Sequence, residues 1–403
     1  LIMRPTLTMP ALTKFVDGTG PVWTGNLFPF LFITIACGAV SGFHALISSG
    51  TTPKMLANES QACFIGYGGM LMESFVAIMA LVAACIIDPG VYFAMNSPMA
   101  VLAPAGTTDV VASAAQVVSG WGFSITPDTL HQIASEVGEQ SIISRAGGAP
   151  TLAVGMAYIL HGSLGGLMDV SFWYHFAILF EALFILTAVD AGTRAARFML
   201  QDLLGVISPG LKKTSSLPAN LLATALCVLA WGYFLHQGVV DPLGGINTLW
   251  PLFGIANQML AGMALMLCAV VLFKMKRQRY AWVALLPTSW LLICTLTAGW
   301  QKSFSPDTKV GFLAIANKFQ AMIDSGNIPP QYTESQLAQL VFNNRLDAGL
   351  TIFFMIVVVV LALFSIKTAL AALKEDKPTA KETPYEPMPE NLDAIETQAK
   401  GAH

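Results

Sequence analysis

The feature that most constrains this sequence is a set of long apolar runs that contain no Asp, Glu, Lys or Arg. Three such runs cover residues 246–273, 280–300 and 349–366. A helix that crosses the hydrocarbon core of a bilayer needs about 20 mostly apolar residues, and these runs meet or approach that length. Only 11% of the 403 residues are charged, whereas soluble domains carry about 25%. The sequence therefore predicts an all-α membrane protein, a polytopic helical bundle.

The expected bundle occupies residues 1–373, and a charged, Pro-containing tail, residues 374–403, is expected to be disordered in the cytoplasm. The segment 151–166 is short and rich in Gly, which suits a re-entrant segment better than a full span, although both readings stay open. The chain opens with Leu1-Ile2-Met3-Arg4-Pro5, which resembles the end of a helix whose N-terminal body is missing. Seven segments are predicted to be full spans: 26–40, 63–87, 170–189, 217–236, 246–273, 280–300 and 349–366.

Basic residues predict the orientation, because cytoplasmic loops of membrane proteins are enriched in Lys and Arg. Clusters at 194–213, 274–279 and 367–381 lie two predicted spans apart, so they share the cytoplasmic side. The segment 88–147 has five acidic residues against one basic residue and is expected outside, with surface helices near 109–119 and 127–138. The remaining polar stretch, 301–347, is predicted to be a loop.

Acidic residues in predicted spans are candidates for proton coupling, since placing a carboxylate at the centre of a membrane helix costs roughly 2.5–3.5 kcal/mol on insertion scales. Glu73 and Glu181 lie well inside apolar runs, and Asp190 lies at the end of one. The alternative for each is a structural carboxylate that bonds a neighbouring helix. Sodium coupling also stays open, because the interrupted segment 41–52 offers hydroxyl and carbonyl oxygens.

The segment 41–52 interrupts an apolar run with Ser, Gly and His, a pattern typical of a discontinuous transporter helix. Unwound backbone is tolerated in a membrane only where it lines a cavity or is buried in protein. Gly42 is expected to leave room for substrate, and 247–258 forms a second polar interruption. A packing kink is the alternative. The predicted substrate-binding residues are Ser41, Gly42, His44, Ser48, Ser49, Thr51, Asn257 and Gln258.

No motif for enzymatic chemistry is present: GxSxG, HExxH and P-loop patterns are lacking. No cofactor or metal is predicted, and a net charge of −3 with no basic patch gives no reason to expect nucleic acid as a partner. Broken helices and carboxylates within spans favour a secondary transporter. An intramembrane structural or signalling component and a lipid-modifying membrane enzyme remain as alternatives.

Three strings resemble the carbon starvation protein A family: GAVSGFHALISSGTTPK at 38–54, GYGGMLMES at 66–74 and LWPLFGIANQ at 249–258. The resemblance extends over nearly the whole chain. It implies a bacterial inner-membrane uptake system for peptides and, in related members, pyruvate, used when carbon is scarce. It also implies the amino acid–polyamine–organocation superfamily fold, an inverted repeat of five plus five helices. Family members are longer, so N-terminal helices of the same protein are expected as partners of this chain.

Overall fold

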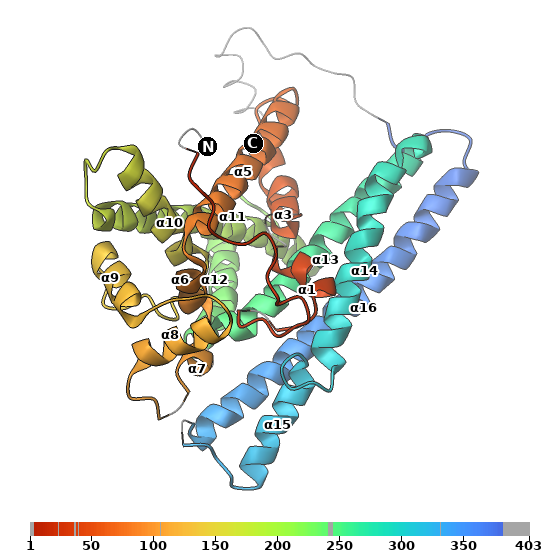
Figure 1. The fold of residues 1–403 in the computed structure, drawn as a ribbon. Coiled ribbons are helices and arrows are strands. Elements are labelled where there is room, and N and C mark those ends of the chain that lie inside the picture. Colours follow the sequence, from red (N-terminus) through yellow and green to blue (C-terminus); the bar gives the residue numbers. More distant parts are fainter. Residues whose placement is uncertain are drawn as a thin grey trace. The chain divides into compact units, whose positions relative to one another are not determined.

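The computed structural model describes residues 4–22, 24–35, 38, 40–104, 106–240, 245–330 and 332–381, and within these ranges the regular elements are all helices (Figure 1). Six of the described helices are long and apolar enough to cross a membrane. The prediction of an all-helical membrane protein is thereby confirmed. The six helices are α5 (Gln61–Ile86), α11 (Val170–Ile207), α12 (Leu217–Val240), α13 (Gly245–Lys274), α14 (Trp282–Phe304) and α16 (Glu334–Lys374).

The seventh predicted span, 26–40, contains the short helix α1 (Leu27–Thr34). Residues 36, 37 and 39 lie outside the described residues, so the count of seven spans stays a prediction. Two further short helices follow, α3 (Gly42–Gly50) and α4 (Thr52–Met55). The predicted tail lies outside the described residues from position 382 onward.

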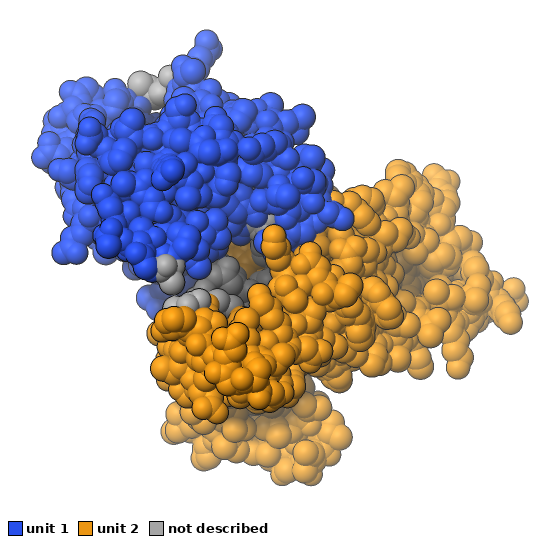
Figure 2. Space-filling view, turned by 60° about the horizontal axis from the view of Figure 1, so that its bottom comes forward, with its two compact units in different colours: residues 1–27, 73–188 blue, residues 28–72, 189–403 orange. Residues whose placement is uncertain are grey.

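The chain divides into two compact units, residues 1–27 with 73–188 and residues 28–72 with 189–403, which Figure 2 colours separately. The first unit folds the segment predicted to lie outside into a series of short helices around an apolar core. The short helices of this unit are α6 (Pro89–Asn96), α7 (Met99–Leu102), α8 (Val110–Gly120), α9 (Pro127–Val137) and α10 (Gly148–Ser163). Fully buried core residues include Ala94, Leu102, Val118, Val137 and Val154. The two predicted surface helices are confirmed as α8 and α9.

Polar residues of the first unit set where its helices begin. Asp88 accepts from the backbone N–H of Gly90 (2.8 Å) at the start of α6, and Asp109 accepts from that of Ala112 (2.9 Å) at the start of α8. Such caps satisfy N–H groups that have no partner within the helix. Two of the acidic residues that predicted an outside location are therefore also helix caps.

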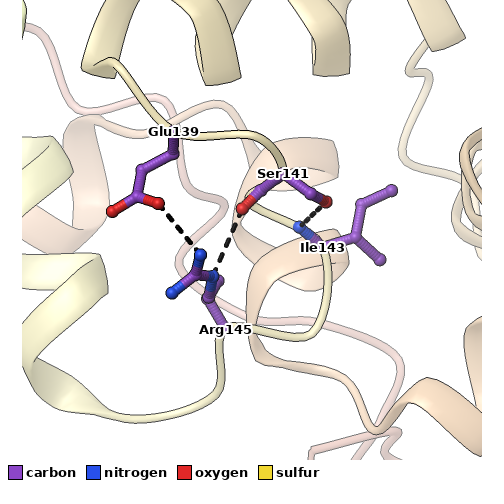
Figure 3. A network of polar contacts seen from close by, with 4 residues as sticks. All are labelled: Glu139, Ser141, Ile143 and Arg145. Carbon is purple, nitrogen blue, oxygen red and sulfur yellow. Dashed lines mark hydrogen bonds and ion pairs between the residues drawn. The ribbon is translucent and has the colours of Figure 1, made fainter.

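The connection between α9 and α10 is closed by Arg145 (Figure 3). Its guanidinium donates to Glu139 Oε2 at 2.9 Å and to the carbonyl oxygen of Ser141 at 3.2 Å. The Ser141 hydroxyl in turn accepts from the backbone N–H of Ile143 at 3.1 Å. This network fixes the turn that leads into α10, the helix at the predicted re-entrant segment.

In the second unit α13 is the central helix, and α3, α12, α14 and α16 all pack against it. The prediction of a loop at 301–347 is wrong for most of its length. α14 continues to Phe304, α15 (Phe312–Asp324) follows, and α16 begins at Glu334. Apolar residues at helical spacing in this stretch, including Phe319 on α15 and Leu337 and Leu340 on α16, are buried against one another. The many charged and polar residues of this stretch predicted a loop. Its apolar residues recur at helical spacing, however, and α15 and the start of α16 form a helical hairpin.

Candidate functional site

The segment 41–52 is helical rather than unwound, which corrects the sequence prediction. The helical course of the chain is interrupted at Ser41, whose backbone is extended (φ −100°, ψ 118°). Helix α3 begins at the next residue. The Ser41 hydroxyl accepts from the backbone N–H of His44 at 3.3 Å and so caps α3. A serine before an apolar stretch thus starts a helix here, as N-cap residues commonly do.

The hydroxyls of α3 mostly bond their own helix. Ser48 and Ser49 both donate to the carbonyl oxygen of Ala45, at 3.0 and 2.8 Å, and Thr51 donates to that of Ile47 at 3.0 Å. Such bonds back to the preceding turn use the hydroxyl hydrogen and leave its lone pairs as acceptors. Ser48, Ser49 and His44 are exposed on α3, whereas Thr51 is buried.

Gly42 faces α13 and not an open space. A Cβ added there would lie 2.1 Å from the carbonyl oxygen of Asn257, 2.4 Å from Leu260 Cβ and 2.7 Å from the backbone nitrogen of Ala261. The glycine therefore lets α3 approach the backbone of α13 closely. This corrects the expectation that Gly42 leaves room for substrate.

Asn257 joins α13 to the start of α3. Its Oδ1 atom accepts from the backbone N–H of Phe43 at 2.8 Å and lies 3.4 Å from the Ser41 hydroxyl. Since an N–H can only donate, the atom facing Phe43 is the oxygen, and the remaining atom Nδ2 is a donor. Asn257 is 3% exposed, and Nδ2 has no hydrogen-bond partner among the described residues.

Gln258 makes the complementary contact with α1. Its Nε2 atom donates to the carbonyl oxygen of Phe32 at 3.5 Å, so the remaining atom Oε1 is an acceptor. Gln258 is fully buried, and Oε1 has no hydrogen-bond partner among the described residues. Leaving a buried polar atom unsatisfied costs about 1–3 kcal/mol, so one donor and one acceptor on adjacent residues indicate a place where a polar ligand binds.

These contacts define the candidate site, which we call the α3–α13 site: the start of α3, the end of α1, and the amides of Asn257 and Gln258. The structure brings together Ser41, Gly42, Asn257 and Gln258 from the predicted set. Ser48, Ser49 and His44 lie further along α3. All of these residues belong to the second unit.

None of the predicted coupling acids is among the residues that define the α3–α13 site. Glu73 is exposed on α5 and Glu181 is half-buried on α11, both in the first unit. Asp190 is exposed and accepts from Arg194, one turn later on α11, at 2.8 Å. None of these three carboxylates is buried in the structure.

Sequence reasoning missed a group of buried polar residues on α14 and α16, which we call the α14–α16 cluster. Two charged residues, Lys302 and Asp347, lie just outside the uncharged runs 280–300 and 349–366, where charges ordinarily reach water. Their burial became evident only once helix packing was known. The buried polar residues of the two helices are Thr288, Thr295, Lys302, Ser303, Asn343, Asn344, Asp347 and Thr351.

Six long apolar helices, with a polar interruption packed on one of them, define a multi-pass membrane protein. The family model described as carbon starvation protein CstA matches residues 1–298. The chain belongs to this family, which confirms the resemblance in the sequence. No solved structure matches it.

Two relatives from Escherichia coli (strain K12) bear different names. Over all 403 residues the chain is 94% identical to "Peptide transporter CstA" and covers 58% of that protein. It is 58% identical over 408 residues to "Pyruvate/proton symporter BtsT", an alignment that includes 97% of this chain and 57% of that protein. A third relative, "Peptide transporter CstA" of Mycobacterium tuberculosis (strain ATCC 25618 / H37Rv), is 49% identical over 391 residues and is covered over 51% of its length. The chain thus spans little more than half the length of these relatives.

Proposed function

We propose that this chain forms part of a secondary transporter that takes up small carbon nutrients, peptides or pyruvate, across the bacterial inner membrane during carbon starvation. The names of the relatives support both substrate classes, and one relative is named as a proton symporter. The observation that carries the proposal is the pair of unsatisfied amide atoms in the α3–α13 site. Peptides and pyruvate share a carboxylate, which Asn257 Nδ2 can bind, and a peptide ammonium or amide N–H can donate to Gln258 Oε1.

Uptake by the full-length protein tests this function. Purified protein in liposomes should accumulate labelled dipeptide or labelled pyruvate when an inward proton gradient is imposed, and an uncoupler should abolish the accumulation. Protein-free liposomes and a gradient-free arm serve as controls. Intact protein that moves neither substrate under any gradient would reject the proposed function.

The architecture we propose is an inverted repeat of five plus five helices, with α1, α3 and α4 as parts of the discontinuous sixth helix. The N-terminal repeat would come from the rest of the full-length protein. Discontinuous helices commonly form transporter sites at the interface between repeats. The interrupted path at Ser41 supports this assignment. Glu73, Glu181 and Asp190 remain proposed coupling residues, and their amide variants belong in the uptake assay above.

We also propose that the 88–147 segment faces the periplasm and that the end of α16 faces the cytoplasm, because basic residues gather at the latter end. Ser135 on α9 and Lys377 after α16 are both exposed positions. In a cysteine-free background, Ser135→Cys should react with an impermeant maleimide added to intact cells, and Lys377→Cys should react only after the cells are permeabilised. Equal reaction of both in intact cells would contradict this orientation.

A further inference from the structure

The end of α11 and the loop after it carry an excess of basic residues that do not belong to the α3–α13 site. Between positions 189 and 220, four basic residues stand against two acidic ones: Arg194, Arg197, Lys212 and Lys213 against Asp190 and Asp202. The charge of Asp190 is balanced by Arg194, which donates to it at 2.8 Å. Asp202 is exposed. This end of α11 therefore has a net positive charge.

Hydrogen bonds between α11 and α12 leave one buried acceptor without a partner. Asn220 Nδ2 on α12 donates to the carbonyl oxygen of Thr214 at 2.7 Å, so the other atom of that amide, Oδ1, is an acceptor. Gln201 Nε2 on α11 donates to this Oδ1 at 2.8 Å, which makes Gln201 Oε1 an acceptor. Gln201 is 1% exposed, and its Oε1 has no hydrogen-bond partner among the described residues. A ligand with an O–H or N–H group would satisfy this atom.

Arg197 provides the complementary donor one helical turn before Gln201. Residues four apart share a face of a helix, so both side chains lie on the side of α11 that bonds α12. Arg197 is half-buried, and its Nε–H has no hydrogen-bond partner in the part of the chain that the structure describes. Its Cζ atom lies 4.8 Å from the ring centroid of Phe198, an aromatic face that attracts the cation without neutralising it. Arginine commonly binds phosphate through such N–H groups.

The loop 208–216 brings a second cation to the same face of α11. A Cβ at Gly205 would lie 2.7 Å from Lys212 Cβ and 3.2 Å from Lys212 Cδ, so the stem of Lys212 lies across α11 at this glycine. Arg197, Gln201 and Gly205 follow one another at intervals of one turn, along about 12 Å of the helix (eight residues at about 1.5 Å each). We call Arg197, Gln201 and Lys212 the α11–α12 site. Its members run from the guanidinium, farthest from the loop, through the amide to the loop ammonium.

Aliphatic side chains are exposed near the α11–α12 site. They are 62–83% exposed and comprise Leu203, Val206 and Ile207 on α11 and Leu217 and Leu221 on α12. Exposed aliphatic side chains on spanning helices are suited to contact with acyl chains. In a phospholipid the phosphate lies next to the acyl chains, and the headgroup alcohol lies further out. The order in the site is the same, with the phosphate-binding Arg197 deeper in the helix pair than the Gln201 acceptor.

We propose that the α11–α12 site binds an anionic phospholipid of the phosphatidylglycerol class. Arg197 binds the phosphodiester, a headgroup hydroxyl donates to Gln201 Oε1, and Lys212 adds a second positive charge. An ammonium headgroup also has a donor for Oε1, but the loop lysines would repel it. The basic residues predict that this end of α11 faces the cytoplasm, where pockets of Lys and Arg between spanning helices bind anionic headgroups. This inference goes beyond the proposed function, because it concerns lipid binding and does not require transport.

The test measures lipid binding by delipidated full-length protein in a neutral detergent. The probes are dioleoyl phosphatidylglycerol, dioleoyl phosphatidylethanolamine and soluble glycerol phosphate. Native mass spectrometry measures retained lipid, and thermal unfolding measures stabilisation. We expect phosphatidylglycerol to be retained and to raise the Tm more than phosphatidylethanolamine does, with no effect of glycerol phosphate. Arg197→Gln should weaken phosphatidylglycerol binding roughly tenfold or more, because it removes a charged donor. Lys374→Gln, at an exposed position on α16, should bind as the wild type does.

A second variant keeps the test informative if Arg197→Gln does not fold. Lys212 and Lys213 are exposed, so the double variant Lys212→Gln with Lys213→Gln should remain folded and bind phosphatidylglycerol several-fold more weakly. Wild-type binding by Arg197→Gln, or by the double variant, would overturn the inference. Equal retention of the two lipids would do the same, as would equal stabilisation by glycerol phosphate, which would assign the site to a soluble anion. A wild-type protein that retains no phosphatidylglycerol would also overturn it. None of these outcomes bears on the uptake assay, which tests the proposed function separately.

Discussion

Replacing Gly42 with alanine is expected to lower the Tm of the full-length protein and to reduce uptake sharply. The new methyl group would lie 2.1 Å from the carbonyl oxygen of Asn257, so α3 must move away from α13. Atoms forced into a well-packed interface typically cost about 1–3 kcal/mol, and here the obstacle is backbone that no side-chain rotation can relieve. Thermal unfolding in detergent, followed by tryptophan fluorescence, measures the effect.

Gly262 provides a matched control for this substitution. It lies on α13, and a Cβ there would be 3.9 Å from Leu291 Cβ, an ordinary contact distance. Gly262→Ala should leave the Tm unchanged or slightly higher, since alanine favours the helix over glycine by about 1 kcal/mol. Equal Tm values for Gly42→Ala and the wild type would show that α3 does not pack against α13 as described here.

Asn257→Asp is expected to separate substrate binding from structure. The carboxylate retains an oxygen that can accept from the backbone N–H of Phe43, and its charge lies at the positive N-terminal end of α3. It loses the Nδ2 donor and repels a substrate carboxylate. Uptake should therefore fall by roughly tenfold or more, since one hydrogen bond to a charged group contributes about 1.5–3 kcal/mol. Rates of labelled pyruvate and dipeptide uptake measure the change.

Asn257→Leu is the structural comparison. It removes the acceptor for the Phe43 N–H as well as the donor, so both the Tm and the uptake should decrease. If Asn257→Asp binds and transports as the wild type does, the Nδ2 atom has no role with substrate, and the α3–α13 site must be reassigned as a packing contact.

The sequence was informative wherever a local rule determined the outcome. Apolar length predicted the long helices, and the two surface helices predicted near 109–119 and 127–138 are α8 and α9. Such rules failed where contacts between segments far apart in the sequence determine the structure. The hairpin of α15 and α16 depends on apolar residues that meet across the turn. The need for glycine at position 42 comes from the backbone of Asn257, 215 residues away in the sequence (257 minus 42).

The candidate site was predicted in its residues more than in its geometry. Asn257 and Gln258 were selected as polar residues in an apolar run, and the structure places them against α3 and α1. The burial of Lys302 and Asp347 could not be predicted, because a charge next to a span usually extends into water. Only the packing of α14, α15 and α16 around them shows that they are enclosed.

The most direct test of this account is whether substrate occupies the α3–α13 site. Ser48 is exposed on α3, so Ser48→Cys in a cysteine-free full-length protein provides a reactive reporter, with Ser135→Cys on α9 as the control. The rate of maleimide labelling is measured with and without saturating dipeptide or pyruvate. We predict that substrate slows labelling at position 48 several-fold and leaves position 135 unchanged. Identical rates at position 48, in a preparation that still transports, would contradict the assignment of the site.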